Sequence, residues 1–112
     1  MGPRHKIAGF LNVTPRQGAE TLANWATFRT RHIREEGSRQ VRIAAAATGL
    51  RFPSGVGSCV IDDYRNADTR YREIACLVRG ARATTVIVGA APVSDWNRQA
   101  RVIEPAIASF AT

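Results

Sequence analysis

Residues 58–80, SCVIDDYRNADTRYREIACLVRG, hold two runs of strand-forming residues separated by a short polar stretch at 66–69. Such a pattern predicts an antiparallel β-hairpin with a tight turn. If the turn is centred between Ala67 and Asp68, residues equally far from that centre face each other. The facing pairs are then Cys59 with Cys76, Ile61 with Ile74, Asp63 with Arg72, and Tyr64 with Tyr71. A sheet favours each of these pairings, so independent pairs agree on one register.

The cysteine pair lies an odd number of steps from the pair that closes the turn. This places it at a non-hydrogen-bonded position, where facing side chains approach most closely. We therefore predict a disulfide between Cys59 and Cys76 in an oxidising compartment. The alternative is two reduced, buried cysteines that act as small apolar side chains in the cytoplasm. No metal site is expected, because two sulfurs without nearby Cys or His fall short of the four ligands typical of zinc.

The rest of the chain continues the pattern on both sides of the hairpin. Thr14-Pro15 followed by Gln17 is a helix start signal, and Gly37 a stop signal, so a helix is predicted over 15–36. Ser94 begins a second helix over 95–110, which Pro105 should kink. Strands are predicted at 40–47, 58–65, 70–79 and 83–91, a further short one at 7–13, and a turn-rich loop at 48–57. We expect an α+β fold in which an antiparallel meander packs against an N-terminal and a C-terminal helix on a common sheet face.

Length and composition indicate a single globular domain. The chain has 112 residues, 45% of them hydrophobic and 22% charged, so we treat 1–112 as one unit with a flexible tail at 1–6. No apolar run approaches the roughly 20 residues that cross a bilayer. The start lacks the cleavage site of a signal peptide, so any export signal is expected outside this chain. Every basic residue except Lys6 is arginine, which is typical of GC-rich bacterial coding.

The formal net charge is +7, and several of the basic residues cluster in the stretch 29–42. Its arginines form a candidate binding surface for an acidic protein, an anionic envelope component or nucleic acid: Arg29, Arg31, Arg34, Arg39 and Arg42. The alternative is a solvated helix face partly balanced by Glu35 and Glu36. Nucleic-acid binding favours exposed aromatic residues among the basic ones, whereas Trp25 and Phe28 fit the core side of the helix.

Two carboxylates, Asp62 and Glu73, face each other on the hairpin and could in principle act as an acid–base pair. We expect instead that they are solvated and balanced by Arg65, Arg70 and Arg72. No Cys-His or Ser-His-Asp arrangement can be derived from the spacing, so the sequence predicts neither catalysis nor a cofactor.

The order of parts also resembles a known family. A long first helix, a hairpin with Tyr64 and Tyr71, a strand TTVIVGAAP at 84–92 and a last helix that ends in Ile107-Ala108-Ser109-Phe110 are similar to the PsbP-like family. The likeness is greatest to the LpqN-type secreted proteins and lipoproteins of actinobacteria, and it covers residues 14–112. Family members commonly open with a hairpin, where this chain offers only 7–13.

The resemblance implies a PsbP-like sandwich, a non-catalytic and mostly extracytoplasmic fold used for docking, assembly or chaperone-like binding. It supplies no functional residues. We predict a small extracytoplasmic binding or accessory domain that recognises a protein partner or an envelope component. A basic nucleic-acid-binding protein is the alternative, and an enzyme that uses Asp62 and Glu73 is a more distant one.

Overall fold

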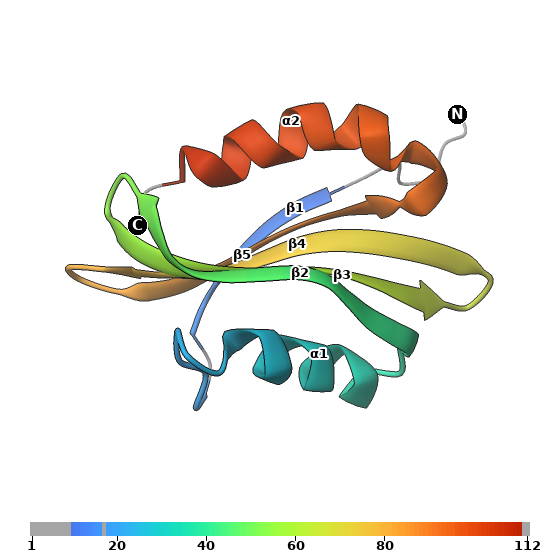
Figure 1. Ribbon diagram of the computed structural model, residues 1–112, viewed down its shortest axis with the longest axis horizontal. Helices are drawn as coiled ribbons and strands as arrows, with labels where there is room; N and C mark the ends of the chain where they lie inside the picture. Colours follow the sequence, from blue (N-terminus) through green and yellow to red (C-terminus); the bar gives the residue numbers. More distant parts are fainter. Residues whose placement is uncertain (1–9, 17, 111–112) are drawn as a thin grey trace.

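The structure of the protein, a computed structural model, describes residues 10–16 and 18–110 (Figure 1). Five strands form one antiparallel sheet in the order β1-β5-β4-β3-β2. The strands are β1 (Phe10–Pro15), β2 (Arg39–Phe52), β3 (Gly55–Asn66), β4 (Thr69–Gly80) and β5 (Thr84–Pro92). The helices are α1 (Trp25–Glu35), the short 3-10 helix η1 (Val93–Asp95) and α2 (Trp96–Ala108). The tail expected at 1–6 lies outside the described residues.

The expected arrangement of the helices is wrong, although the protein is an α+β domain. The helices do not share a sheet face, because α1 lies on one face and α2 on the other (Figure 1). Strands hold 53% of the described residues and helices 27%, so the sheet is the principal element. It contains β1 as a fifth strand at the edge beside β5, in addition to the four strands of the expected meander.

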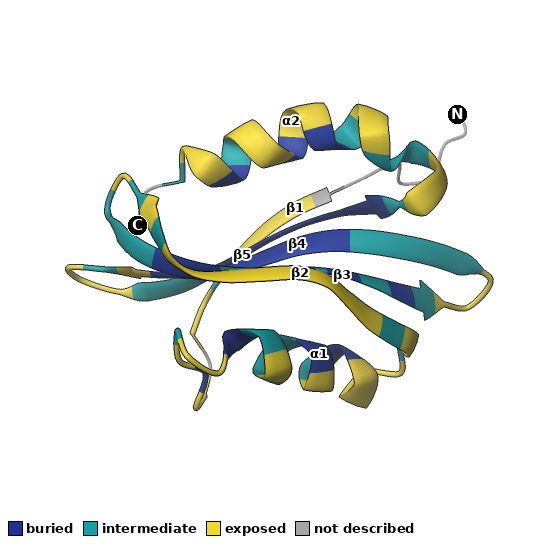
Figure 2. Cartoon of the chain, in the orientation of Figure 1, coloured by how far each residue is buried: buried dark blue, intermediate teal, exposed yellow. Residues whose placement is uncertain are grey.

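Two apolar layers explain why both faces need a helix. Side chains of the central strands alternate between the faces. On one face Val60, Leu77 and Val88 pack with Trp25 of α1. On the other face Cys76, Val78 and Ile87 pack with Ile103 and Ile107 of α2. As a result, β4 is buried without interruption from Glu73 to Val78, and Figure 2 shows the burial concentrated on β3, β4 and β5.

The first helix is shorter than predicted, and the start signal at Thr14-Pro15 is misleading. Both residues belong to β1, where Thr14 is the register partner of Val86 and Pro15 that of Thr85. Proline is tolerated there because β1 is an edge strand. The helix begins instead after Asn24, whose side chain accepts a hydrogen bond from Thr21 N at 2.7 Å, while Thr21 Oγ accepts one from Asn24 N at 3.1 Å. The closing helix is close to expectation and continues through Pro105.

Strand β2 is longer than predicted and includes much of the expected loop. It runs to Phe52, and its pairing with β3 is irregular at three places, between Arg39 and Arg42, between Ile43 and Ala45, and between Ala47 and Leu50. The last irregularity contains Gly49 at a φ of 70°. A glycine inside a strand often marks such a bulge, so Thr48-Gly49 bends the strand and does not end it.

The hairpin register and the disulfide are confirmed. Strands β3 and β4 pair from Asn66 with Thr69 outward, and all four facing pairs predicted above occur. Tyr64 and Tyr71 stack with ring centroids 5.6 Å apart. Cys59 and Cys76 form a disulfide with a Cα–Cα distance of 4.1 Å, in keeping with a non-hydrogen-bonded position.

Gly89 allows α2 to pack closely on β5. A Cβ atom at this position would overlap Cγ2 of Ile103, whose side chain is buried in the core. We expect Gly89→Ala to lower the free energy of unfolding by about 1–3 kcal/mol, since it overpacks this contact. Urea denaturation is the measurement. Gly37→Ala is unsuitable as a control, because Gly37 has a φ of 102°. Gly18→Ala is the control, since among the described residues its new Cβ would meet only Glu20 Oε1, at 3.5 Å, and it should change stability much less.

Candidate functional site

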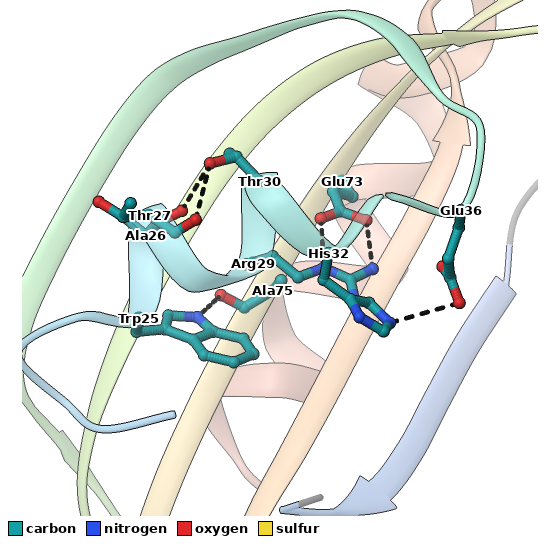
Figure 3. A network of polar contacts seen from close by, with 9 residues as sticks. All are labelled: Trp25, Ala26, Thr27, Arg29, Thr30, His32, Glu36, Glu73 and Ala75. Carbon is teal, nitrogen blue, oxygen red and sulfur yellow. Dashed lines mark hydrogen bonds and ion pairs between the residues drawn. The ribbon is translucent and has the colours of Figure 1, made fainter. Parts of the chain in front are cut away.

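A cluster of charged residues is buried between α1 and the sheet. Arg29 of α1 donates hydrogen bonds from Nε and Nη2 to the two carboxylate oxygens of Glu73 at 2.8 and 2.9 Å (Figure 3). Burial acts to lower the pKa of Arg29, but the hydrogen bonds and charge of Glu73 outweigh it, so the pKa is raised. Trp25, one turn before Arg29 in α1, adds a hydrogen bond from its Nε1 to the carbonyl oxygen of Ala75 at 2.8 Å.

Asp62, the register partner of Glu73, is fully buried, and no donor among the described residues reaches either of its carboxylate oxygens. Burial, and then the charge of Glu73, raise its pKa to about 9. The carboxyl group is therefore neutral at physiological pH, and its O–H can donate a hydrogen bond to the carboxylate of Glu73. The expectation that Asp62 and Glu73 are solvated is wrong, because β3 and β4 bring them together beneath α1. The buried pair is a structural cluster that solvent does not reach.

The five arginines of the expected binding surface do not form one surface. Arg29 is turned inward, with 17% of its side chain exposed. Arg31 and Arg34 are exposed on α1. Arg39 and Arg42 are exposed on β2, where their register partners are Arg65 and Asp63.

Residues across β2, β3 and β4 form a second basic group, which residue spacing alone does not predict. Arg39 pairs with Arg65, and Arg65 pairs with Arg70, so three arginines stand side by side in one row. The neighbouring row on the same face is Arg42, Asp63 and Arg72. We call these five arginines, Arg39, Arg42, Arg65, Arg70 and Arg72, the arginine surface. The hairpin register already predicted that Arg65 faces Arg70, but the irregular pairing of β2 could not be derived from the sequence.

Asp63 is the one acidic residue in these two rows, and it is engaged by Arg72. Arg72 donates from Nε and Nη2 to its two carboxylate oxygens at 2.6 and 2.9 Å. This hydrogen bonding lowers the pKa of Asp63 against the opposing effect of partial burial, and the charges of Arg72, Arg70 and Arg42 lower it further. The arginine surface therefore keeps an excess of positive charge around a single neutralised carboxylate.

The arginine surface adjoins an open sheet edge. Within the described residues, β2 pairs with β3 on one side and with no strand on the other. Its residues from Arg42 to Gly49 are exposed, as the yellow colour of β2 in Figure 2 shows. Like charges that face each other across strands are destabilising. The arginine row consequently costs folding free energy.

Other functional features are few in residues 10–16 and 18–110. No group of three or more His, Cys, Asp or Glu side chains there could hold a metal ion. No helix in this part of the chain is long and apolar enough to cross a membrane.

Comparisons with known proteins show a shared fold. No family model and no curated protein matches the chain. Among solved structures, the chain is similar to the crystal structure of a Pseudomonas aeruginosa protein of unknown function, PA94, with a TM-score of 0.62. The likeness covers 92% of this chain and 83% of that one at 6% sequence identity. At this identity it supports the architecture of the sheet and its two helices, and nothing about the site.

Proposed function

We propose that this protein is a small, non-catalytic binding domain that works outside the cytoplasm and docks an acidic segment of a protein partner on the arginine surface. The observation that carries the proposal is the row of Arg39, Arg65 and Arg70 in direct cross-strand register. Such a row is unfavourable for the isolated fold and becomes favourable when an anionic partner lies across it. The disulfide supports an oxidising location.

The size of the row favours a protein segment over a nucleic acid. Neighbouring strands lie about 4.8 Å apart, so a row across three strands spans about 10 Å. This width matches one extended segment with two or three carboxylates. A nucleic acid is usually held by a longer basic track with exposed aromatic side chains, whereas Tyr64, which precedes Arg65 in β3, is 8% exposed and stacks on Tyr71. The resemblance to the PsbP-like family also supports this proposal, because it implies a role in docking and assembly.

Charge removal on the arginine surface should weaken binding far more than the same change elsewhere. We expect Arg39→Gln combined with Arg70→Gln to weaken binding of a fluorescent hexaglutamate peptide about tenfold at physiological salt, because two guanidinium partners are lost. Fluorescence anisotropy measures the affinity. The matched control is Arg82→Gln combined with Arg101→Gln, which removes the same charge from two exposed positions outside the surface and should change affinity little.

Equal weakening by both double variants would show that net charge, and not this surface, binds the peptide, and would refute the proposal. Tighter binding of a short DNA duplex than of the peptide, with a steep loss on added salt, would favour the nucleic-acid alternative and also refute it.

A further inference from the structure

The two outer strands of the sheet differ in how well they are protected against further pairing. Within residues 10–16 and 18–110, β1 pairs with β5 alone, as β2 pairs with β3 alone. Strand β2 has three irregularities and carries arginines, and bulges and charges of this kind discourage an added strand. Strand β1 follows β5 without a register shift, its sequence FLNVTP has no charged residue, and Figure 2 shows most of it exposed. The protection of β1 is limited to Pro15 at its end.

Alternate residues of β1 turn their backbone hydrogen-bonding groups away from the sheet. Arg16 N donates to the carbonyl oxygen of Thr84 at 3.1 Å, so this N–H points toward β5. Along an antiparallel strand, hydrogen bonding to one neighbour alternates from residue to residue. The even-numbered residues of β1 therefore bond to β5, while the N–H and C=O groups of Leu11 and Val13 point outward. Pro15 shares the outward direction, so its missing N–H leaves the pairing with β5 intact.

The same two residues hold exposed apolar side chains on the face that α2 covers. Val13 is the register partner of Ile87, which packs with Ile103 of α2. Leu11 is the register partner of Gly89, on the same face. The side chains of Leu11 and Val13 are each 47% exposed. An open strand edge with outward backbone groups and apolar side chains at the same positions is a surface for another strand.

One flank of α2 extends this apolar surface. Glu104, on the other flank, lines a hollow together with Leu50 and Phe52 of β2. Val102 comes two positions before Glu104, which places it about 200° away around the helix and so on the flank toward β1. Its side chain is 69% exposed. The β1 edge therefore has exposed apolar side chains from both a strand and a helix.

A second copy of β1 is complementary to this edge. When two β1 strands run antiparallel about a two-fold axis between their Asn12 residues, Leu11 of each copy faces Val13 of the other. Both residues direct their backbone groups to the partner strand, so each facing pair exchanges two N–H···O=C hydrogen bonds. Their side chains form apolar cross-strand pairs on the α2 face. The two Asn12 side chains meet on the opposite face, where one amide can donate to the other.

We propose that β1 pairs with β1 of a second copy of this chain, so that the two sheets join into one sheet around a two-fold axis. The arginine surface lies toward the other edge of the sheet, so this dimer keeps the two basic surfaces at its far ends and limits their repulsion. The dimer surface is separate from the docking function proposed above.

The length of β1 sets the expected strength of the dimer. Its six residues extend over about 20 Å. A contact of that length is smaller than a standard interface of about 1,600 Å², so we expect a weak dimer that forms at high micromolar concentrations.

Sedimentation equilibrium of the unaltered chain at physiological salt tests the dimer. Between about 10 μM and 1 mM, the mass should rise from that of one chain toward that of two and then stop, because an isologous pair is closed. A monomer mass throughout this range overturns the proposal. A mass that keeps rising beyond two chains also overturns it, because β1 would then pair with β2 of the next copy.

A charge placed in the expected interface should weaken it. Val13→Arg should weaken dimerisation at least about tenfold, because each guanidinium group would lie beside Leu11 of the other copy. Ile43→Arg is the matched control, since Ile43 is 50% exposed on the other outer strand, and dimerisation should not change. Loss of the dimer in Ile43→Arg alone would place the interface on β2, and equal weakening by both variants would show that net charge controls association. Either result overturns the proposal, and thermal unfolding establishes that each variant is folded.

Amide hydrogen exchange tests the register on the unaltered protein. The N–H groups of Asn12 and Thr14 bond to β5, so their exchange rates should be similar at low and at high protein concentration. The N–H groups of Leu11 and Val13 should exchange faster than these at low concentration and slow by about threefold or more near 1 mM, where the second copy binds them. Exchange at Leu11 and Val13 that stays the same while the mass rises would contradict pairing through β1.

Discussion

Replacement of Asp62 by asparagine is expected to raise the free energy of unfolding by several kcal/mol near pH 8 and to leave it nearly unchanged near pH 4. Burial, followed by the charge of Glu73, raises the pKa of Asp62 to about 9 in the folded protein. The unfolded chain has an ordinary aspartate pKa of about 3.9. Between these two values the folded state holds a proton that the unfolded state has lost.

Stability must therefore fall as pH rises through this window, by at most about 1.4 kcal/mol per pH unit. Asparagine keeps the size of the side chain and an N–H donor for Glu73, and it does not titrate, so the slope should disappear in Asp62→Asn. Urea denaturation at several pH values between 4 and 9 measures both slopes.

Asp63→Asn is the matched control, one residue along the same strand and on the opposite face. The Arg72 hydrogen bond lowers the pKa of Asp63, so its contribution is present above the unfolded pKa and is lost as pH falls. Asp63→Asn should therefore destabilise the protein at neutral pH, opposite in sign to Asp62→Asn. A wild-type stability that is constant between pH 5 and pH 8 would show that Asp62 is ionised in the folded protein, contrary to its burial without a donor.

Loss of the Cys59–Cys76 disulfide should be the second large effect. The two residues are 17 positions apart, and the chain-entropy relation assigns about 3 kcal/mol to a loop of this length. For a domain of this size such a loss lowers the melting temperature by about 10–20 °C. The reduced protein should stay folded, because Cys76 is fully buried and both cysteines pack in the layer beneath α2.

Differential scanning calorimetry with and without reductant measures the difference in melting temperature between the oxidised and the reduced protein. The variant in which both Cys59 and Cys76 are replaced by alanine is the control, since its melting temperature should not respond to reductant. Equal melting temperatures of the oxidised and reduced protein would contradict the stabilising role of the bridge.

Local pairing in the hairpin could be predicted from the sequence because a two-residue turn fixes the register of both strands at once. This is why the cysteine, tyrosine and Asp63–Arg72 pairs were all correct. The layer arrangement was missed although β4 and β5 carry its signal. Ile74 to Val78 and Val86 to Ala91 are continuous apolar runs, which indicate strands covered on both faces, while a one-sided sheet would alternate.

The candidate site was predicted only in part, for two physical reasons. Strand β2 contains bulges, and Gln40 has a φ of 53°, so its register with β3 does not follow from residue spacing. The pairing of Arg39 with Arg65 could therefore not be predicted from the sequence. The inward turn of Arg29 depends on Glu73, which lies 44 positions away, and no local pattern in α1 distinguishes Arg29 from the exposed Arg31.

The docking role of the arginine surface is tested most directly by nuclear magnetic resonance. Unlabelled hexaglutamate peptide is added to the ¹⁵N-labelled protein, and backbone amide shifts are followed residue by residue. We expect the largest changes at Arg39, Arg65 and Arg70 and in the turn between β3 and β4. Changes centred on Arg31 and Arg34 of α1, or spread evenly over all the arginines, would contradict it.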